Sequence, residues 1–166
     1  GNTASAYSSS SSDYSNASGG AIYAAGNLGI RNNDFVLFEK NAEIRVGTYR
    51  LRSIYAGGSG DVISLSAAAG KSIEFRDSVY IASGSTVNLN ADYTDANGVF
   101  HNQTGDIIFT GKYTEQHLNE LLAADGLSRS ATAEEILNSR TTEVQAMTNL
   151  YGGRLRVEAG AIYKGY

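Results

Sequence analysis

The sequence contains no cysteine, no proline and no tryptophan. Without cysteine, the chain has no disulfide bonds and no cysteine-ligated metal sites. Proline interrupts the hydrogen-bonded ladder between strands, so its absence fits a chain in which nearly every strand donates hydrogen bonds to a neighbour. Long hydrophobic runs are also missing, since no stretch approaches the roughly 20 apolar residues that an α-helix needs to cross a membrane.

Charged residues are scarce as well. They make up 18% of the 166 residues, and the formal net charge is −4 at pH 7. A dedicated nucleic-acid-binding protein needs a basic stripe to meet phosphate groups, and this sequence shows none. We therefore expect no nucleic-acid partner. The length is sufficient for one domain with a hydrophobic core.

The most frequent feature of the chain is a short pattern in which two apolar residues flank a central residue, usually close to a glycine or a small polar turn. Each unit predicts a very short strand whose alternate side chains point inward. Leu28, Leu51 and Ile73 are 23 and 22 residues apart, which is typical of one coil of a parallel β-helix. A single coil cannot bury its own apolar face, so such coils must stack.

The pattern changes from strand to helix at Thr114, a candidate helix cap that Leu118 and Leu122 follow with helical spacing. A second helix is indicated by Thr132–Glu135, which has the composition of a capping box. We interpret this acidic helical stretch in two ways: it is either a protruding contact module or a cover for the edge of a sheet.

The sequence thus predicts an all-β fold, a parallel β-helix (β-solenoid) with a short α-helical insertion. Its expected organisation is a serine-rich mobile loop over 1–18, β-helix coils over 19–113, a helical insertion over 114–149 and a returning coil over 150–166. Neither end has the polar capping repeat that solenoids need. We expect the chain to be a segment of a longer repeat protein.

Two motifs resemble those of a known family. Gly19-Gly20-Ala21-Ile22-Tyr23 resembles the Gly-Gly-Ala-Ile motif of autotransporter passenger domains and polymorphic outer-membrane proteins, and Phe38-Glu39-Lys40-Asn41 matches their Phe-x-x-Asn form. The resemblance implies a right-handed parallel β-helix in a Gram-negative bacterium, at the outer membrane, on the cell surface or secreted. Membrane contact would come only through a C-terminal barrel, which this chain does not contain.

Tyrosine is the dominant aromatic residue, with eleven tyrosines against five phenylalanines. Tyrosine stacks on sugars and peptides, so we select Tyr49, Tyr55, Tyr80 and Tyr93 as candidate binding residues. The alternative is that the tyrosines stack on one another within the scaffold. Together with the resemblance, this predicts a non-catalytic passenger segment that acts in adhesion, with a host surface protein or glycan as partner.

Two other functions remain open. Asp92 and Asp95, followed by His101, form the best candidate cluster for a carbohydrate-active enzyme, a polysaccharide hydrolase or lyase. Aspartates in such positions also hydrogen-bond their own turns, which is the structural alternative. The second function is that of a purely structural spacer that binds nothing. We expect no cofactor and no metal site.

Overall fold

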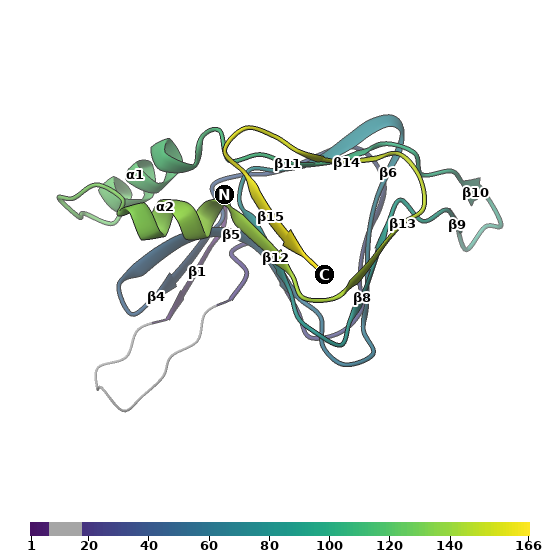
Figure 1. Cartoon of the computed structure of the whole chain (residues 1–166), viewed down its shortest axis with the longest axis horizontal. Coiled ribbons are helices and arrows are strands. Elements are labelled where there is room, and N and C mark those ends of the chain that lie inside the picture. Colours follow the sequence, from purple (N-terminus) through teal and green to yellow (C-terminus); the bar gives the residue numbers. More distant parts are fainter. Residues whose placement is uncertain (7–17) are drawn as a thin grey trace.

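The computed structural model describes residues 1–6 and 18–166. Within this part of the chain, strands alternate with turns as far as Phe109, two helices follow, and strands then resume (Figure 1). The elements are β1 (Thr3–Ala6), β2 (Ile22–Ala24), β3 (Leu28–Phe38), β4 (Ala42–Arg45), β5 (Thr48–Ala56), β6 (Val62–Phe75), β7 (Ser78–Ile81), β8 (Thr86–Leu89), β9 (Tyr93–Thr94), β10 (Phe100–His101), β11 (Asp106–Phe109), α1 (Thr114–Ala124), α2 (Ala133–Arg140), β12 (Thr141–Val144), β13 (Met147–Leu150), β14 (Arg154–Val157) and β15 (Ile162–Gly165).

One sheet is parallel throughout its described pairings and contains β3, β6, β8, β11, β13 and β14. Strands far apart in the sequence lie in register, so equivalent side chains form columns across the sheet. In one column Phe38 pairs with Phe75, which pairs in turn with Phe109. Their rings stack with centroids 4.9 and 5.0 Å apart. This aromatic column belongs to the main hydrophobic core, which otherwise consists mostly of aliphatic side chains.

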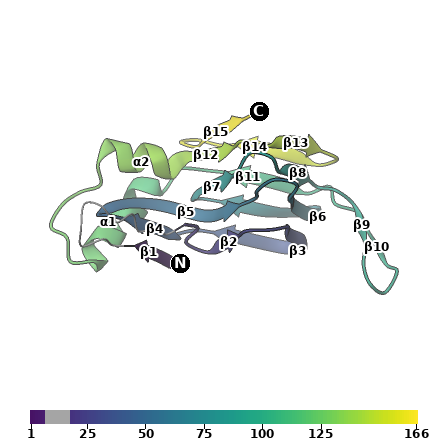
Figure 2. The same ribbon diagram turned by 90° about the horizontal axis from the view of Figure 1, so that it is seen from below.

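The other large sheet is mixed. Strand β5 pairs in parallel with β2 and β7, and the parallel ladder continues from β7 through β12 to β15. Figure 2 shows these strands stacked in chain order. The earlier part of β5, residues 48–51, pairs antiparallel with β4, and β1 extends the sheet beyond β4. The main core lies between the parallel part of this sheet and the first sheet.

A second, smaller core lies where the two helices cover the β4–β5 hairpin (Figure 1). Leu118 and Leu122 of α1 are fully buried there. The side chains of Glu135 and Ser139, on α2, accept hydrogen bonds from the backbone N–H groups of Tyr49 and Leu51. These are edge groups of β5, which would otherwise have no strand to pair with. Of the two interpretations of the helical stretch, the structure supports the cover for a sheet edge.

The predicted fold class, an all-β right-handed parallel β-helix, is wrong. The structure is a mixed α/β fold, with two helices, a mixed sheet, a parallel sheet and the short antiparallel hairpin β9–β10. The reason lies in β4 and β5. Leu51, which the spacing predicts within a coil of the β-helix, instead belongs with Ile44 to an antiparallel hairpin whose apolar face is buried against the helices.

The expected helical stretch 114–149 contains both helices, but strands resume within it, because β12 begins at Thr141 directly after α2. A capping box starts α2: the Thr132 hydroxyl accepts from Glu135 N–H, and the Glu135 carboxylate accepts from Thr132 N–H. The predicted serine-rich loop lies mostly outside the described residues, although Thr3–Ala6 forms β1. Neither described helix is long and apolar enough to cross a membrane.

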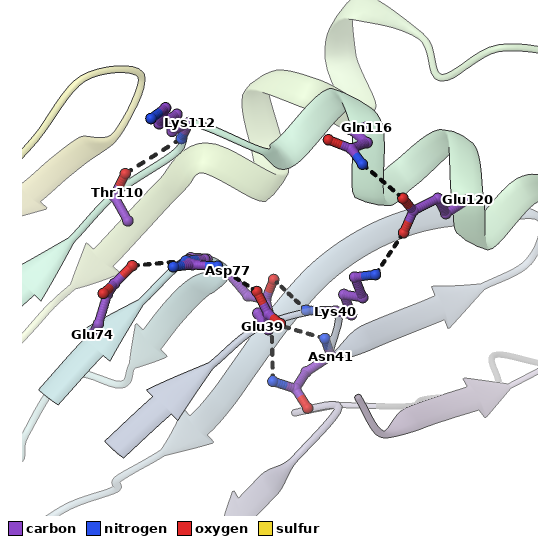
Figure 3. A network of polar contacts seen from close by, with 10 residues as sticks. Glu39, Lys40, Asn41, Glu74, Asp77, Thr110, Lys112, Gln116 and Glu120 are labelled. Carbon is purple, nitrogen blue, oxygen red and sulfur yellow. Dashed lines mark hydrogen bonds and ion pairs between the residues drawn. The ribbon is translucent and has the colours of Figure 1, made fainter. Parts of the chain in front are cut away.

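A buried polar junction connects the two cores (Figure 3). The carboxylate of Asp77, between β6 and β7, accepts hydrogen bonds from the backbone N–H of Lys40 and from the backbone and side chain of Asn41. Lys40 then reaches α1 through an ion pair with Glu120, with Nζ and Oε2 2.8 Å apart. Lys40 has a left-handed backbone conformation, with a φ of 59°. Its contacts with Asp77 and Glu120 hold the turn from β3 into β4 in this conformation.

Candidate binding groove

A groove of about 730 Å³ opens beside the β4–β5 hairpin. Its walls come from the polar face of that hairpin and from the outward face of the adjoining parallel strands. The lining residues are Ser18, Tyr23, Glu43, Arg45, Thr48, Arg50, Arg52 and Tyr55. Most of them belong to β4 and β5, so the fold of this hairpin determines the shape and charge of the groove.

The hairpin has two different faces because its side chains alternate. Glu43 lies opposite Arg50, and Arg45 lies opposite Thr48, on the face that lines the groove. The intervening residues, Ala42, Ile44, Tyr49 and Leu51, are all buried in the second core. The helices thus bury the apolar face and leave the polar face as one wall of the groove.

A β-bulge in β5 brings an aromatic residue onto the same wall. The pairing of β5 with β7 shifts register between Arg52 and Ile54, so that Ser53 is an extra residue. A bulge of this kind changes which residues of a strand point to a given face. As a result Arg52 and Tyr55, three residues apart, both line the groove, whereas Ile54 is fully buried in the main core.

Three tyrosines stack along the outer face of the parallel strands. Tyr23, Tyr55 and Tyr80 occupy one register column of β2, β5 and β7. The ring centroids are 5.8 Å apart for Tyr23 and Tyr55, and 4.7 Å apart for Tyr55 and Tyr80. Tyr23 ends the column and is 63% exposed. It therefore offers a ring face to a ligand, while its neighbours offer ring edges and hydroxyl groups.

The guanidinium of Arg52 lies beside this column, with Cζ 5.8 Å from the ring centroid of Tyr55 and 5.4 Å from that of Tyr80. Nη1 of Arg52 forms an ion pair with Oε2 of Glu43 at 2.9 Å. The contact is not a directed hydrogen bond, and Arg52 Nε is buried without a hydrogen-bond partner among the described residues. Burial lowers the pKa of Arg52, and the Glu43 carboxylate opposes that shift.

The wall is locally positive although the chain is acidic. Among the described residues, three arginines and one carboxylate line the groove, which gives this part of the lining a formal charge of +2, against −4 for the whole chain. Arg50 is half-buried, and its guanidinium forms no ion pair with any described residue. This combination of open tyrosine surface and arginine is suited to binding a polar ligand that bears negative charge.

The structure brings two of the four selected tyrosines together, namely Tyr55 and Tyr80. Tyr49 is 3% exposed and lies on the opposite face of the hairpin, where its hydroxyl donates a hydrogen bond to Asp125. Tyr93 lies at the β9–β10 hairpin and stacks on His101 with centroids 4.8 Å apart. Neither of these two residues contributes to the groove.

The candidate catalytic cluster forms turn contacts. Asp95 accepts hydrogen bonds from the backbone N–H groups of Asn97 and Val99 and lies 3.0 Å from Nε2 of His101. Asp92 accepts from the backbone N–H of Gln103. The described residues contain no group of three or more histidine, cysteine, aspartate or glutamate residues that could hold a metal ion. The geometry therefore supports the structural alternative for these aspartates.

Sequence reasoning did not select Glu43, Arg50, Arg52 or Tyr23 as site residues. A signal for the arginines is present, because Thr48, Arg50 and Arg52 alternate with the apolar Tyr49 and Leu51. Such alternation is typical of a strand with one buried and one open face. The position of Tyr23 depends on parallel pairing with a strand about thirty residues later, which no local pattern indicates.

Comparisons of the chain with protein-family models, with curated proteins and with solved structures found no match.

Proposed function

We propose that this chain is a non-catalytic binding module that contacts glycans through the groove and its tyrosine column. The observation that supports this function best is the Tyr23–Tyr55–Tyr80 stack with Arg52 beside it. An aromatic face packs well against the C–H groups of a sugar ring, and the phenolic hydroxyls can bond sugar hydroxyls. Tyr23 supplies the open face and Tyr55 a hydroxyl close by.

The chemistry of the groove favours binding over glycoside cleavage. Most glycosidases need two carboxyl groups on either side of the scissile bond. The described lining has one carboxylate, Glu43, and this group is held by Arg52. A polysaccharide hydrolase or lyase is therefore the weaker proposal for this site.

Surface display belongs to the same proposal, through the resemblance to autotransporter passengers. The Gly-Gly-Ala-Ile-Tyr motif leads into β2 and ends with Tyr23, so the segment that resembles the family also supplies the end of the tyrosine column. On a bacterial surface such a groove would act in adhesion, with many weak contacts adding up on a polymeric glycan. A structural spacer is the competing function.

The test is a binding measurement on the purified chain. Calorimetric titration with dextran, polygalacturonate, methyl-esterified polygalacturonate and heparin oligosaccharides should reveal at least one ligand. Tyr23→Ala should weaken that binding about fivefold, because one aromatic contact is worth about 1 kcal/mol. Tyr23 is largely exposed, so this variant should keep its fold.

Tyr49→Phe is the matched control, because it removes a tyrosine hydroxyl on the buried face of the same hairpin and should leave the affinity unchanged. If none of the four saccharides binds, the chain is a spacer and the proposal is wrong. The proposal is also wrong if Tyr23→Ala binds the ligand as tightly as the wild type does.

A further inference from the structure

We infer that the groove selects saccharides that bear anionic groups, carboxylate or sulfate, over neutral ones. This inference rests on the proposed function and assigns it a ligand class. Arg50 would bind the anionic group, and Tyr23 would pack against the sugar ring that bears it. Arg52 would neutralise Glu43, the one carboxylate in the described lining, so that it does not repel the ligand.

Arg50 is available to bind an anionic ligand. Its guanidinium lies on the groove face and forms no ion pair with a described residue. The nearest acidic residue in the ladder is Glu43, which lies directly opposite on β4, but the Glu43 carboxylate is paired with Arg52. Arg50 is thus a half-buried cation whose closest acid is already neutralised.

Arg52 is held in a fixed position. Its side chain is 9% exposed and is held between Glu43 and the rings of Tyr55 and Tyr80. A guanidinium locked in this way loses little side-chain entropy when a ligand binds. Its ion pair with Glu43 lies in a partly desolvated medium, where charges interact more strongly than in water, so Glu43 should stay paired when an anionic ligand binds.

The positive charge and the aromatic surface of the groove lie next to each other. The cationic side chains come from β4 and β5, and the tyrosine column comes from β2, β5 and β7, so the two surfaces meet along β5. A guanidinium fork matches a carboxylate or sulfate in two hydrogen bonds, and an adjacent tyrosine face fits a pyranose ring. A neutral sugar would contact the tyrosine column but would leave the guanidinium of Arg50 without an ionic partner.

The experiment compares two polymers that differ only in charge. Polygalacturonate oligosaccharides should bind at least tenfold more tightly than their methyl esters at low salt, and the difference should shrink as salt is raised. Heparin oligosaccharides, which bear sulfate in addition to carboxylate groups, test whether sulfate strengthens binding. Arg50→Gln should remove most of the preference for the acid, because it weakens binding of polygalacturonate much more than binding of the methyl ester.

The control for Arg50→Gln is Arg154→Gln, which removes the same charge from an exposed arginine on β14, outside the groove lining. It should leave the preference intact. Equal affinity for polygalacturonate and its ester, with both weakened by Tyr23→Ala, would overturn the anion selection and keep the proposed glycan binding. Failure of every saccharide to bind would overturn both.

Poly-glutamate of matched length separates charge from sugar recognition. It should bind at least tenfold more weakly than polygalacturonate, because it has no ring to pack on Tyr23. Equal binding of the two polymers would show that the groove takes any polyanion, and it would overturn the assignment to saccharides.

Discussion

Arg52 and Glu43 form a buried ion pair between adjacent strands, with Nη1 and Oε2 2.9 Å apart and each side chain 9% exposed. The two residues belong to β5 and β4, so the pair joins the antiparallel hairpin to the start of the parallel ladder. It also sets the charge of the groove, because it neutralises the one carboxylate in the described lining. The pair is therefore part of both the fold and the site.

Glu43→Gln should destabilise the protein by about 3–5 kcal/mol, because it leaves the Arg52 guanidinium buried without a counter-charge. Urea unfolding at pH 7 measures the change in the free energy of unfolding. Glu120→Gln is the control: it breaks the Lys40 ion pair, whose side chains are 47% and 44% exposed, and should have a much smaller effect. Equal stability of the wild type and Glu43→Gln would contradict the prediction.

Phe75 occupies the centre of the aromatic column, between Phe38 and Phe109, and is 1% exposed. Phe75→Ala should lower the free energy of unfolding by about 3–5 kcal/mol, since it leaves a cavity between two rings that cannot close on each other. Phe100, 63% exposed at the β9–β10 hairpin, is the control, and Phe100→Ala should change stability by less than about 0.5 kcal/mol. Chemical denaturation measures the free energy of unfolding of both variants. Equal losses in Phe75→Ala and Phe100→Ala would contradict the prediction.

Burial raises the pKa of Asp77 to about 6, against 3.8 for the unfolded chain, although the hydrogen bonds from Asn41 and Lys40 oppose the shift. The folded state therefore binds a proton more tightly than the unfolded state does. The contribution of Asp77 to stability should be complete below about pH 4 and should be lost as the pH rises through 6, a change of about 3 kcal/mol.

Asp77→Asn removes this titration. The free energy of unfolding of the wild type, minus that of the variant, should therefore decrease from pH 4 to pH 7, because only the wild type loses the contribution of Asp77. Urea unfolding at several pH values measures it. A difference that is constant across this range would show that the carboxyl group of Asp77 titrates normally.

Glu135 shows the opposite behaviour. Arg129 forms a two-pronged contact with its carboxylate and holds the pKa of Glu135 at about 2, with help from the backbone N–H groups of Thr132 and Tyr49. Its stabilising effect is present above pH 4.5 and should be lost as the pH falls towards 2. Circular dichroism during acid titration should show that Glu135→Gln, which is less stable at pH 7, approaches wild-type stability near pH 2.

A substitution in the capping box of α2 should cause a smaller loss of stability than Glu135→Gln. Thr132→Ala removes one half of the capping box and should cost about 1 kcal/mol. Because the hydroxyl does not titrate, this loss should be the same at pH 7 and at pH 3. A strong pH dependence would indicate that Thr132 acts mainly through the charge of Glu135.

The sequence pattern located many short strands because each strand obeys local alternation. Ile73 and Phe75, or Ile107 and Phe109, point to the same core, as a period of two requires. The pattern could not distinguish a strand that stacks in parallel from one that folds back. Ile44 and Leu51 have the same local signature but form an antiparallel hairpin, and the helices that cover it are far away in the sequence.

The candidate site was only partly predictable for a related reason. Tyr55 and Tyr80 were selected for residue type, and the column that joins them depends on pairing between strands. Tyr49 was selected on the same ground, but it lies on the buried face, one residue before Arg50. The bulge at Ser53 then changes the alternation, so that no fixed period assigns Arg52 and Tyr55 to the same wall.

Gly20 couples the fold to the groove at the point where β2 begins. Its N–H donates to the backbone oxygen of Arg52 at 2.8 Å, and a Cβ added there would lie 2.5 Å from the nitrogen of Ala42. Gly20→Ala should therefore displace β2, with a loss of about 1–3 kcal/mol in stability and a loss of ligand affinity, since β2 positions Tyr23.

Gly26→Ala is the matched control for this substitution, because a Cβ at Gly26 would meet no atom within 4 Å. Urea unfolding and saccharide titration on both variants separate the two effects. If Gly20→Ala is as stable as Gly26→Ala, the close approach at Gly20 does not constrain the fold. If Gly20→Ala loses stability but keeps full affinity, Tyr23 is not the residue that holds the ligand, because the strand that positions it has moved.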